Sequence, residues 1–167
     1  MKIVIAPDSF KGSASSSDIA QWIEYGIHSV IPDCETVKIA IGDGGEGSLD
    51  AVLLAGFTAH SVEVSGPVGN RVTALFAMKG ATAFIEMAQA SGLSQLPGGE
   101  KDALHATSFG TGQIILAALE KGAKKIILAI GGTATTDAGA GALQALGAKL
   151  IDASGNEIAA GGAALSE

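Results

Sequence analysis

Two aspartates follow apolar segments and open glycine-rich turns of one pattern. Asp43 begins Asp43-Gly-Gly-Glu-Gly-Ser-Leu-Asp-Ala51, and Asp137 begins Asp137-Ala-Gly-Ala-Gly-Ala-Leu-Gln-Ala145, so both fit D-x-G-x-G-x-L-x-A. Small residues let backbone N–H groups approach an anion, and the N-terminus of a following helix favours negative charge. A carboxylate beside such a turn suits Mg²⁺ or a substrate hydroxyl. The pattern therefore predicts a phosphate or metal site, with two ordinary strand-to-helix turns as the alternative.

The residues just before Asp137 form the strongest phosphate-type loop in the chain. They combine two glycines and three hydroxyl groups in Gly131-Gly132-Thr133-Ala134-Thr135-Thr136. Backbone N–H groups in such a nest bind phosphate oxygens. We predict that a phosphate is bound by Gly131, Gly132, Thr133, Thr135 and Thr136, and the resemblance described below implies that it belongs to a nucleotide. Thr107-Ser-Phe-Gly-Thr-Gly112 is a second candidate nest, with helix capping as its alternative.

An acid and a base follow the first predicted strand, in Asp8-Ser9-Phe10-Lys11-Gly12-Ser13. Ligands of open α/β sheets bind at the carboxyl ends of strands, so this segment is expected to face the same crevice as Asp43. The net charge of −7 repels anions, which makes Lys11 the cation expected there. We predict that the substrate contacts Asp8, Ser9, Lys11 and Glu46. A solvent loop with a surface lysine is the alternative.

Glu86 ends the apolar segment Phe84-Ile85-Glu86. A buried carboxylate needs a partner, so Glu86 is either functional or held by structural hydrogen bonds.

The first part of the chain alternates strands and helices. Strands are predicted at 2–6 and 36–41. A helix capped by Ser17 runs between them, and a short helix after the turn that begins at Asp43 ends at Gly56. The first helix has an apolar stripe made of Ile19, Trp22, Ile23, Gly26, Ile27 and Val30. This order predicts a parallel sheet with right-handed crossovers.

The pattern changes after a boundary expected near residues 56–66. Strands are predicted at 60–64, 71–78 and 82–87, and the tight connection Lys79-Gly80 makes this part antiparallel or mixed. A helix at 111–121, a strand at 125–130 and a helix ending at Leu146 follow. A hairpin is expected from 148–151 and 156–159.

Composition excludes several classes of protein. The acidic charge argues against nucleic acid and anionic membranes as partners, and Cys34 is the single cysteine, so neither a disulfide within the chain nor a cysteine zinc site is possible. No segment is long enough to span a membrane, so we expect a cytoplasmic protein. Gly42-x-Gly44-x-x-Gly47 matches a dinucleotide fingerprint, but Asp43 and Glu46 would lie where the pyrophosphate binds.

Six collinear segments together resemble the bacterial glycerate kinases of the glyoxylate/glucarate type. They are 1–12, Asp43-Gly-Gly-Glu-Gly47, Ser65-Gly-Pro-Val-Gly69, 85–93, Ser108-Phe-Gly-Thr-Gly-Gln113 and 130–147. The family usually has Ser and Asn where Thr133 and Thr136 stand, and Gly where Ala138 stands. Family members are longer, so the resemblance implies that this chain is an N-terminal part, inactive alone and prone to self-association as a homo-oligomer.

The resemblance also implies a fold and an activity. Residues 1–60 would begin a discontinuous, doubly wound, flavodoxin-like parallel sheet, incomplete here, and 61–167 would begin a second, mixed α/β domain. ATP and Mg²⁺ would serve to phosphorylate D-glycerate to 2-phosphoglycerate. Asp43, Asp137 and Lys11 would be catalytic, and either Asp43 or Asp137 would bind the metal. The alternatives are a kinase of another small hydroxy acid or sugar acid, and a non-catalytic anion-binding fragment.

Overall fold

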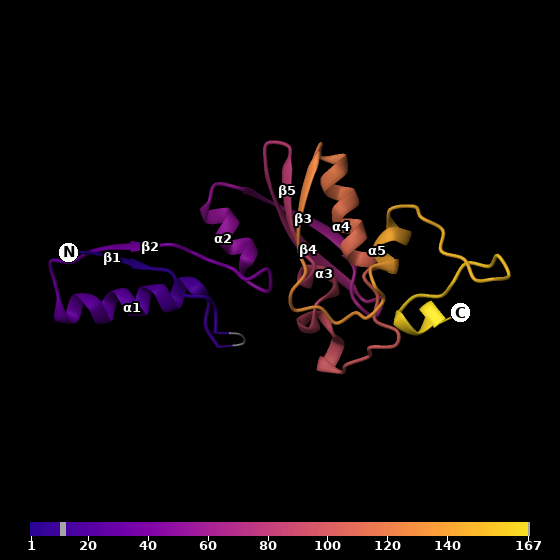
Figure 1. The fold of residues 1–167 in the computed structure, drawn as a ribbon, viewed down its shortest axis with the longest axis horizontal. Helices are drawn as coiled ribbons and strands as arrows, with labels where there is room; N and C mark the ends of the chain where they lie inside the picture. The colour runs from indigo at the N-terminus through magenta and orange to yellow at the C-terminus, as the bar shows by residue number, and fades with distance from the viewer. Residues whose placement is uncertain (11–12, 167) are drawn as a thin grey trace.

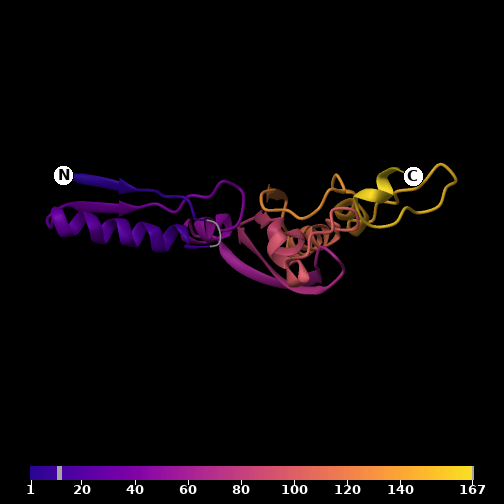
Figure 2. The same cartoon turned by 90° about the horizontal axis from the view of Figure 1, so that it is seen from below.

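The N-terminal unit of the protein is a pair of parallel strands packed against one helix. The computed structural model describes residues 1–10 and 13–166. In it β1 (Lys2–Ile5) pairs with β2 (Glu35–Lys38), with Lys2 opposite Glu35. Helix α1 (Ser16–Val30) connects them and lies along one side of the pair (Figure 1 and Figure 2). The predicted parallel strand–helix–strand unit is therefore confirmed.

Three details of this unit differ from the sequence expectation. The second strand, predicted at 36–41, ends at Lys38. Ser15, not Ser17, caps α1, because the Ser15 hydroxyl accepts the N–H of Asp18 at 3.1 Å. The apolar stripe is only partly buried, since Ile19 is covered whereas Trp22 is 63% exposed. A sheet of two strands is too narrow to cover the whole stripe.

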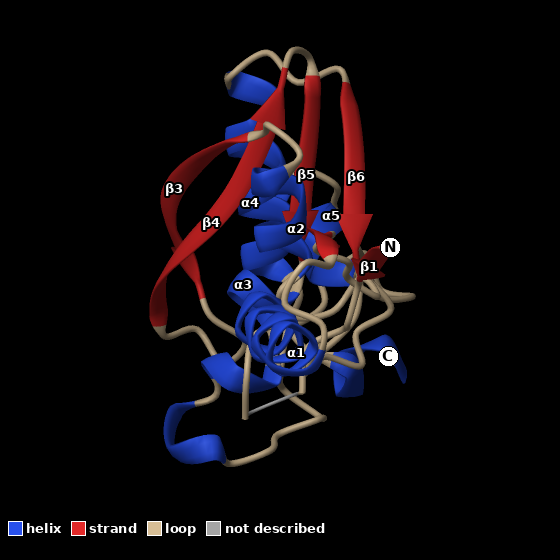
Figure 3. Cartoon of the chain, turned by 90° about the vertical axis from the view of Figure 1, so that its left-hand side faces the viewer, coloured by secondary structure: helices blue, strands red, loops and turns tan. Residues whose placement is uncertain are grey.

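The second unit is built around a four-stranded mixed sheet. It contains β3 (Thr58–Ser65), β4 (Arg71–Lys79), β5 (Thr82–Glu86) and β6 (Lys125–Ala129), in the order β3-β4-β5-β6 (Figure 3). The first two pairings are antiparallel and β5 pairs with β6 in parallel, with Glu86 opposite Ala129. The predicted change from parallel to mixed pairing is confirmed, and the protein is a mixed α/β structure.

Helices cover both faces of this sheet. Helix α2 (Ser48–Leu54) lies on one face, and α4 (Phe109–Glu120) lies on the other together with α3 (Ala88–Ser91) (Figure 1). Helix α5 (Ala140–Ala145) packs against α4. The 3₁₀ turns are η1 (Leu93–Gln95), η2 (Pro97–Gly99) and η3 (Gly162–Ser166). The expected hairpin near the end of the chain is reduced to one bridge between Ile151 and Glu157.

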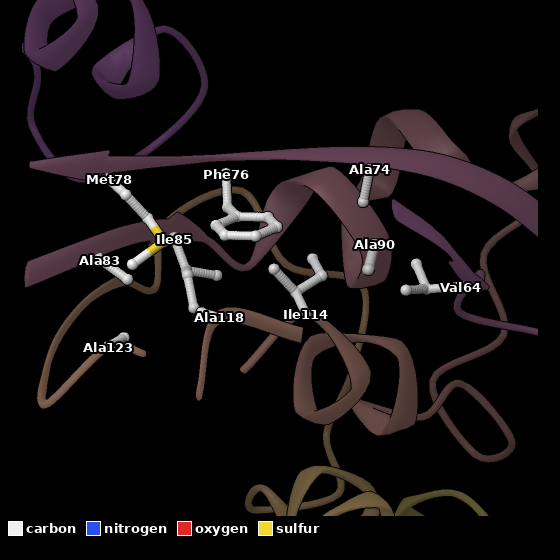
Figure 4. Close-up of a cluster of buried hydrophobic side chains, with 10 residues drawn as sticks. All are labelled: Val64, Ala74, Phe76, Met78, Ala83, Ile85, Ala90, Ile114, Ala118 and Ala123. Carbon is white, nitrogen blue, oxygen red and sulfur yellow. The ribbon is translucent and has the colours of Figure 1, made fainter. Parts of the chain in front are cut away.

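Alternate residues of the strands supply two apolar clusters, as the two-residue period of a strand requires. The cluster facing α4 is built from Val64, Ala74, Phe76, Met78, Ala83, Ile85, Ala90, Ile114, Ala118 and Ala123 (Figure 4). The cluster facing α2 is smaller and consists of Leu49, Ala77, Phe84 and Ala129. Along β5, Phe84 and Glu86 therefore point toward α2. No helix of the described residues is long and apolar enough to cross a membrane.

The close packing of α4 on β3 gives a prediction about stability. A methyl group added at Gly110 would overlap the carbonyl oxygen of Ser65, a backbone atom that cannot move aside. Gly110→Ala should therefore destabilise the protein by about 1–3 kcal/mol. Gly26→Ala is the matched helical control, because nothing lies near the added methyl group. It should stabilise the protein by up to about 1 kcal/mol. Urea unfolding measures both, and equal effects would contradict this packing.

Candidate active site

The two glycine-rich turns meet, backbone against backbone. The N–H of Gly131 donates a hydrogen bond to the carbonyl oxygen of Gly44 at 2.7 Å. A Cβ atom on Gly131 would lie 2.7 Å from the Cα atom of Gly45, closer than atoms can pack. Only glycine at position 131 allows this contact. The structure thus joins the acidic turn that contains Asp43 to the phosphate-type loop.

The position of this contact follows from the parallel strands. The chain leaves β2 at Lys38 and β6 at Ala129, and both exits are carboxyl ends of parallel strands. The N–H of Ile39 binds the carbonyl oxygen of Ile5 at 2.9 Å, and that of Met87 binds Ala129 at 2.8 Å. The contact therefore lies where ligands of α/β proteins bind, although the strands belong to two separate sheets.

Asp43 and Glu46 are exposed on the acidic turn. One Asp43 carboxylate oxygen accepts the N–H of Gly45 at 2.8 Å, and the N–H of Gly44 donates to the Ser48 hydroxyl at 2.9 Å. These bonds fix the turn. Asp43 also borders a hollow of about 400 Å³ whose walls include Ser48 and Phe84.

Glu46 faces a second hollow, on the side of the segment that follows β1. This hollow is about 380 Å³ and is lined by Ser9, Phe10, Ser13, Ala14, Ser15, Asp18, Glu46 and Gly47. Asp8 borders a smaller adjoining cavity of about 50 Å³ together with Ser9 and Glu46. The structure therefore brings together three of the residues predicted to contact substrate. Lys11, the fourth, lies outside the described residues.

The loop 131–136 is held against α3 on its other side. The carbonyl oxygen of Gly132 accepts the N–H of Leu93 at 2.9 Å, and the N–H of Ala134 binds Ser91 at 2.9 Å. Gly132 has a φ of +70°, and a Cβ atom added there would lie 3.7 Å from the Glu46 side chain. The loop is thus fixed with Gly132 exposed beside the acidic turn.

The threonines of this loop are in different settings. The backbone of Thr133 forms a bridge with Gly92, and Thr135 is partly buried. The hydroxyl of Thr136 donates to the carbonyl oxygen of Ala103 at 2.5 Å. This bond engages Thr136 with a segment outside the contact between the two turns.

Asp137 differs from Asp43 because it is almost completely buried, at 1% exposure. One of its carboxylate oxygens accepts the N–H of Ser108 at 2.7 Å, the Ser108 hydroxyl at 2.8 Å and the N–H of Gly141 at 3.1 Å. The hydroxyl of Thr107 also donates to this oxygen, at 3.3 Å, and the N–H of Gly139 donates to the other at 3.1 Å. Asp137 therefore ties the start of α4 to the start of α5. It is the anion that occupies the nest around Ser108.

Glu86 has hydrogen-bond partners within the fold, a question that the sequence left open. It is 2% exposed, accepts the N–H of Leu49 at the start of α2, and accepts the side-chain amide of Gln89 at 3.3 Å. Burial raises the pKa of its carboxyl group, and the carboxylates of Asp50 and Glu46 raise it further, whereas the two hydrogen bonds oppose these effects.

Carboxylates of the described residues do not form a metal cage. Within residues 1–10 and 13–166 there is no group of three or more His, Cys, Asp or Glu side chains arranged to hold an ion. Mg²⁺ is commonly held by one or two carboxylates together with substrate phosphates. An exposed carboxylate beside a phosphate-type loop suits that mode of binding.

Comparison with known proteins decides the family. Residues 3–167 match the model of the glycerate kinase family. The chain belongs to the glycerate kinase family. It is 53% identical to the glycerate 2-kinase of Escherichia coli K12 and 49% identical to the glycerate kinase of Bacillus subtilis 168, over 99% and 100% of this chain.

The family assignment also extends to a solved structure. A crystal structure assigned to glycerate kinase 2 of Salmonella typhimurium LT2 matches with a TM-score of 0.81 and 50% identity, over 99% of this chain and 46% of that one. The chain spans about half the length of the curated relatives that it matches, at 44% of the Escherichia coli and Bacillus subtilis proteins. The resemblance stated from the sequence is therefore confirmed at the level of the family.

Proposed function

We propose that the intact protein phosphorylates D-glycerate to 2-phosphoglycerate with ATP and Mg²⁺, at the contact between the two glycine-rich turns. The observation that carries this proposal is the hydrogen bond from Gly131 to Gly44, which brings Asp43 and Glu46 beside a loop suited to phosphate. Relatives at 53% and 49% identity named glycerate 2-kinase and glycerate kinase support the choice of substrate.

Asp43 and Asp137 would have different roles in the protein. ATP supplies the phosphoryl group, and Mg²⁺ neutralises charge on its phosphates. Asp43 is exposed, so its carboxylate is placed to accept the proton of the glycerate hydroxyl or to contact the metal. Asp137 is buried and accepts five hydrogen bonds, so we assign it a structural role. This assignment separates two aspartates that the sequence pattern treats alike.

The phosphate contacts would come from backbone rather than from every hydroxyl of the loop. The N–H of Gly131 is already bonded to Gly44, and the hydroxyl of Thr136 is bonded to Ala103. We therefore propose that Gly132 and Thr133 present N–H groups to the phosphates. Gly131 shapes the loop, and the hydroxyl of Thr135 is a further candidate donor to the phosphates.

Glycerate would bind in the hollow between the acidic turn and the segment after β1. The Ser9 hydroxyl can donate to the substrate carboxylate, and the carboxylates of Asp8 and Glu46 can accept its hydroxyl groups. Nearby acids disfavour an anion, so a cation is required, and Lys11 is proposed for that role. Residues 1–60 and 61–167 would then belong to two domains, the first flavodoxin-like and doubly wound, in a cytoplasmic enzyme that forms homo-oligomers.

A substitution at Gly132 tests the phosphate loop. Gly132→Val should abolish Mg·ATP binding in the intact protein, because a β-branched side chain is strained at a φ of +70° and blocks the approach of phosphate. Calorimetric titration measures binding, and far-UV circular dichroism checks folding.

Gly155→Val is the matched control for this substitution. Gly155 has a φ of +86° and open space around it, so the same backbone strain falls outside the proposed site. The control should bind Mg·ATP normally. A folded Gly132→Val protein that binds as tightly as wild type would remove the loop from the site.

The reaction itself is tested by ADP release. The intact protein should release ADP with D-glycerate faster than with other small hydroxy acids. Phosphorus NMR then locates the new ester, because phosphate on C2 couples to one proton and phosphate on C3 to two. ADP release with another hydroxy acid alone would favour the alternative kinase, and Mg·ATP binding without transfer to any of them would favour the anion-binding alternative.

A further inference from the structure

Glu86 connects the sheet to the helix that follows the acidic turn. It lies at the carboxyl end of β5, on the face that points toward α2, and opposite Ala129 in the register with β6. One carboxylate oxygen accepts the N–H of Leu49, at the first turn of α2. Gly47 precedes this helix and provides no side-chain cap, so Glu86 supplies from the sheet the acceptor that a capping residue normally supplies.

The second carboxylate oxygen completes a chain of hydrogen bonds across the sheet. The N–H of Leu75 on β4 donates to the side-chain oxygen of Gln89 at 3.2 Å. The side-chain amide of Gln89 then donates to Glu86 at 3.3 Å. These donors point toward position 86, so a group that accepts at both ends satisfies them with Gln89 in its observed orientation. An ionised carboxylate does so, whereas an amide or a protonated carboxyl places a donor against a donor.

This arrangement is not explained by stability alone. Burial and the nearby carboxylates of Glu46 and Asp50, on the acidic turn and on α2, raise the pKa of Glu86. A raised pKa in the folded state means that the contribution of the group to stability is present below pH 4.5 and is lost as the pH rises through the raised value. Once it is ionised, the buried carboxylate therefore lowers stability.

We propose that Glu86 is a positioning residue, whose carboxylate anchors the first turn of α2 to the sheet and thereby fixes the turn that carries Asp43 and Glu46 against Gly131. The proposal rests on the proposed function for its effect on catalysis. Its structural part does not, since the bonds to Leu49 and Gln89 belong to the folded chain itself.

The test removes the carboxylate from position 86 and then moves it to position 89. Glu86→Gln should lower the kcat for glycerate phosphorylation by roughly 10- to 100-fold, the effect expected of a displaced catalytic group. The melting temperature at pH 7 should not fall. The double variant E86Q/Q89E restores an acceptor for each donor. Its amide at position 86 can accept from Leu49 and donate to the carboxylate at position 89, which in turn accepts from Leu75. It should recover most of the lost kcat.

Glu63→Gln is the control, since it removes an exposed carboxylate on β3. It should leave kcat unchanged. Amide hydrogen exchange of residues 44–49 provides a readout that needs no activity: exchange should accelerate in Glu86→Gln and return toward wild type in the double variant. Unchanged exchange in Glu86→Gln, or a double variant no better than the single one in kcat and in exchange, would overturn the proposal. The expected exchange behaviour in a protein inactive toward glycerate would instead count against the proposed function alone.

Discussion

Asp137→Ala should destabilise the protein by about 3 kcal/mol or more, the largest effect on stability that we predict for a single substitution. The substitution leaves buried donors on Thr107, Ser108 and Gly141, and a half-buried donor on Gly139, without their acceptor. For a chain of this length the melting temperature should fall by roughly 6–12 °C. Thermal unfolding followed by circular dichroism measures the change.

Asp152→Ala is the matched control for Asp137. Asp152 also accepts backbone N–H groups, from Ser154 and Asn156 at 2.8 Å each, but in an exposed turn where water can replace it. Its removal should cost about 1 kcal/mol or less. If Asp137→Ala melted at the wild-type temperature and abolished activity, Asp137 would be a reacting group and the division of roles between the two aspartates would be wrong.

Asp43→Asn should lower kcat by about 10²- to 10⁴-fold in the intact protein while leaving its melting temperature unchanged. Asparagine keeps the side-chain oxygen that accepts the N–H of Gly45, so the turn is preserved. It removes the charge that a proton or a metal ion requires. Steady-state kinetics with D-glycerate and Mg·ATP measure the effect, and the KM for ATP should change less than kcat.

Asp33→Asn controls for the loss of one negative charge. Asp33 is an exposed residue between α1 and β2, and its substitution should leave kcat as it is. A kcat for Asp43→Asn within about threefold of wild type, or roughly 0.65 kcal/mol, would make Asp43 a structural turn residue.

Local sequence signals were sufficient for most of the fold. The strand–helix–strand order predicted the parallel pair, because consecutive strands joined by a helix pair in parallel, and the tight connection at Lys79-Gly80 predicted the antiparallel pairing of β4 with β5. The cap of α1 was misplaced by two residues, since Ser15, Ser16 and Ser17 offer the same hydroxyl. Only the geometry of the Asp18 N–H distinguishes them.

The sequence identified candidate site residues but not the settings that the structure gives them. Asp43 and Asp137 share one pattern, and they differ because the partners of Asp137 at Thr107 and Ser108 lie 30 and 29 residues away in the chain. Likewise, the partner of Glu86 at Leu49 is separated from it by 37 residues. Such pairings are set by tertiary packing, so spacing within a motif carries no signal for them.

We propose above that phosphate binds where the two glycine-rich turns meet. Hydrogen–deuterium exchange of the intact protein, with and without Mg·ATP, tests it most directly. Amides of residues 42–47 and 130–136 should become protected on addition of Mg·ATP, and those of residues 107–112, whose nest already holds Asp137, should not change. Protection at 107–112 with none at either glycine-rich turn, in a protein that phosphorylates glycerate, would show that phosphate binds elsewhere.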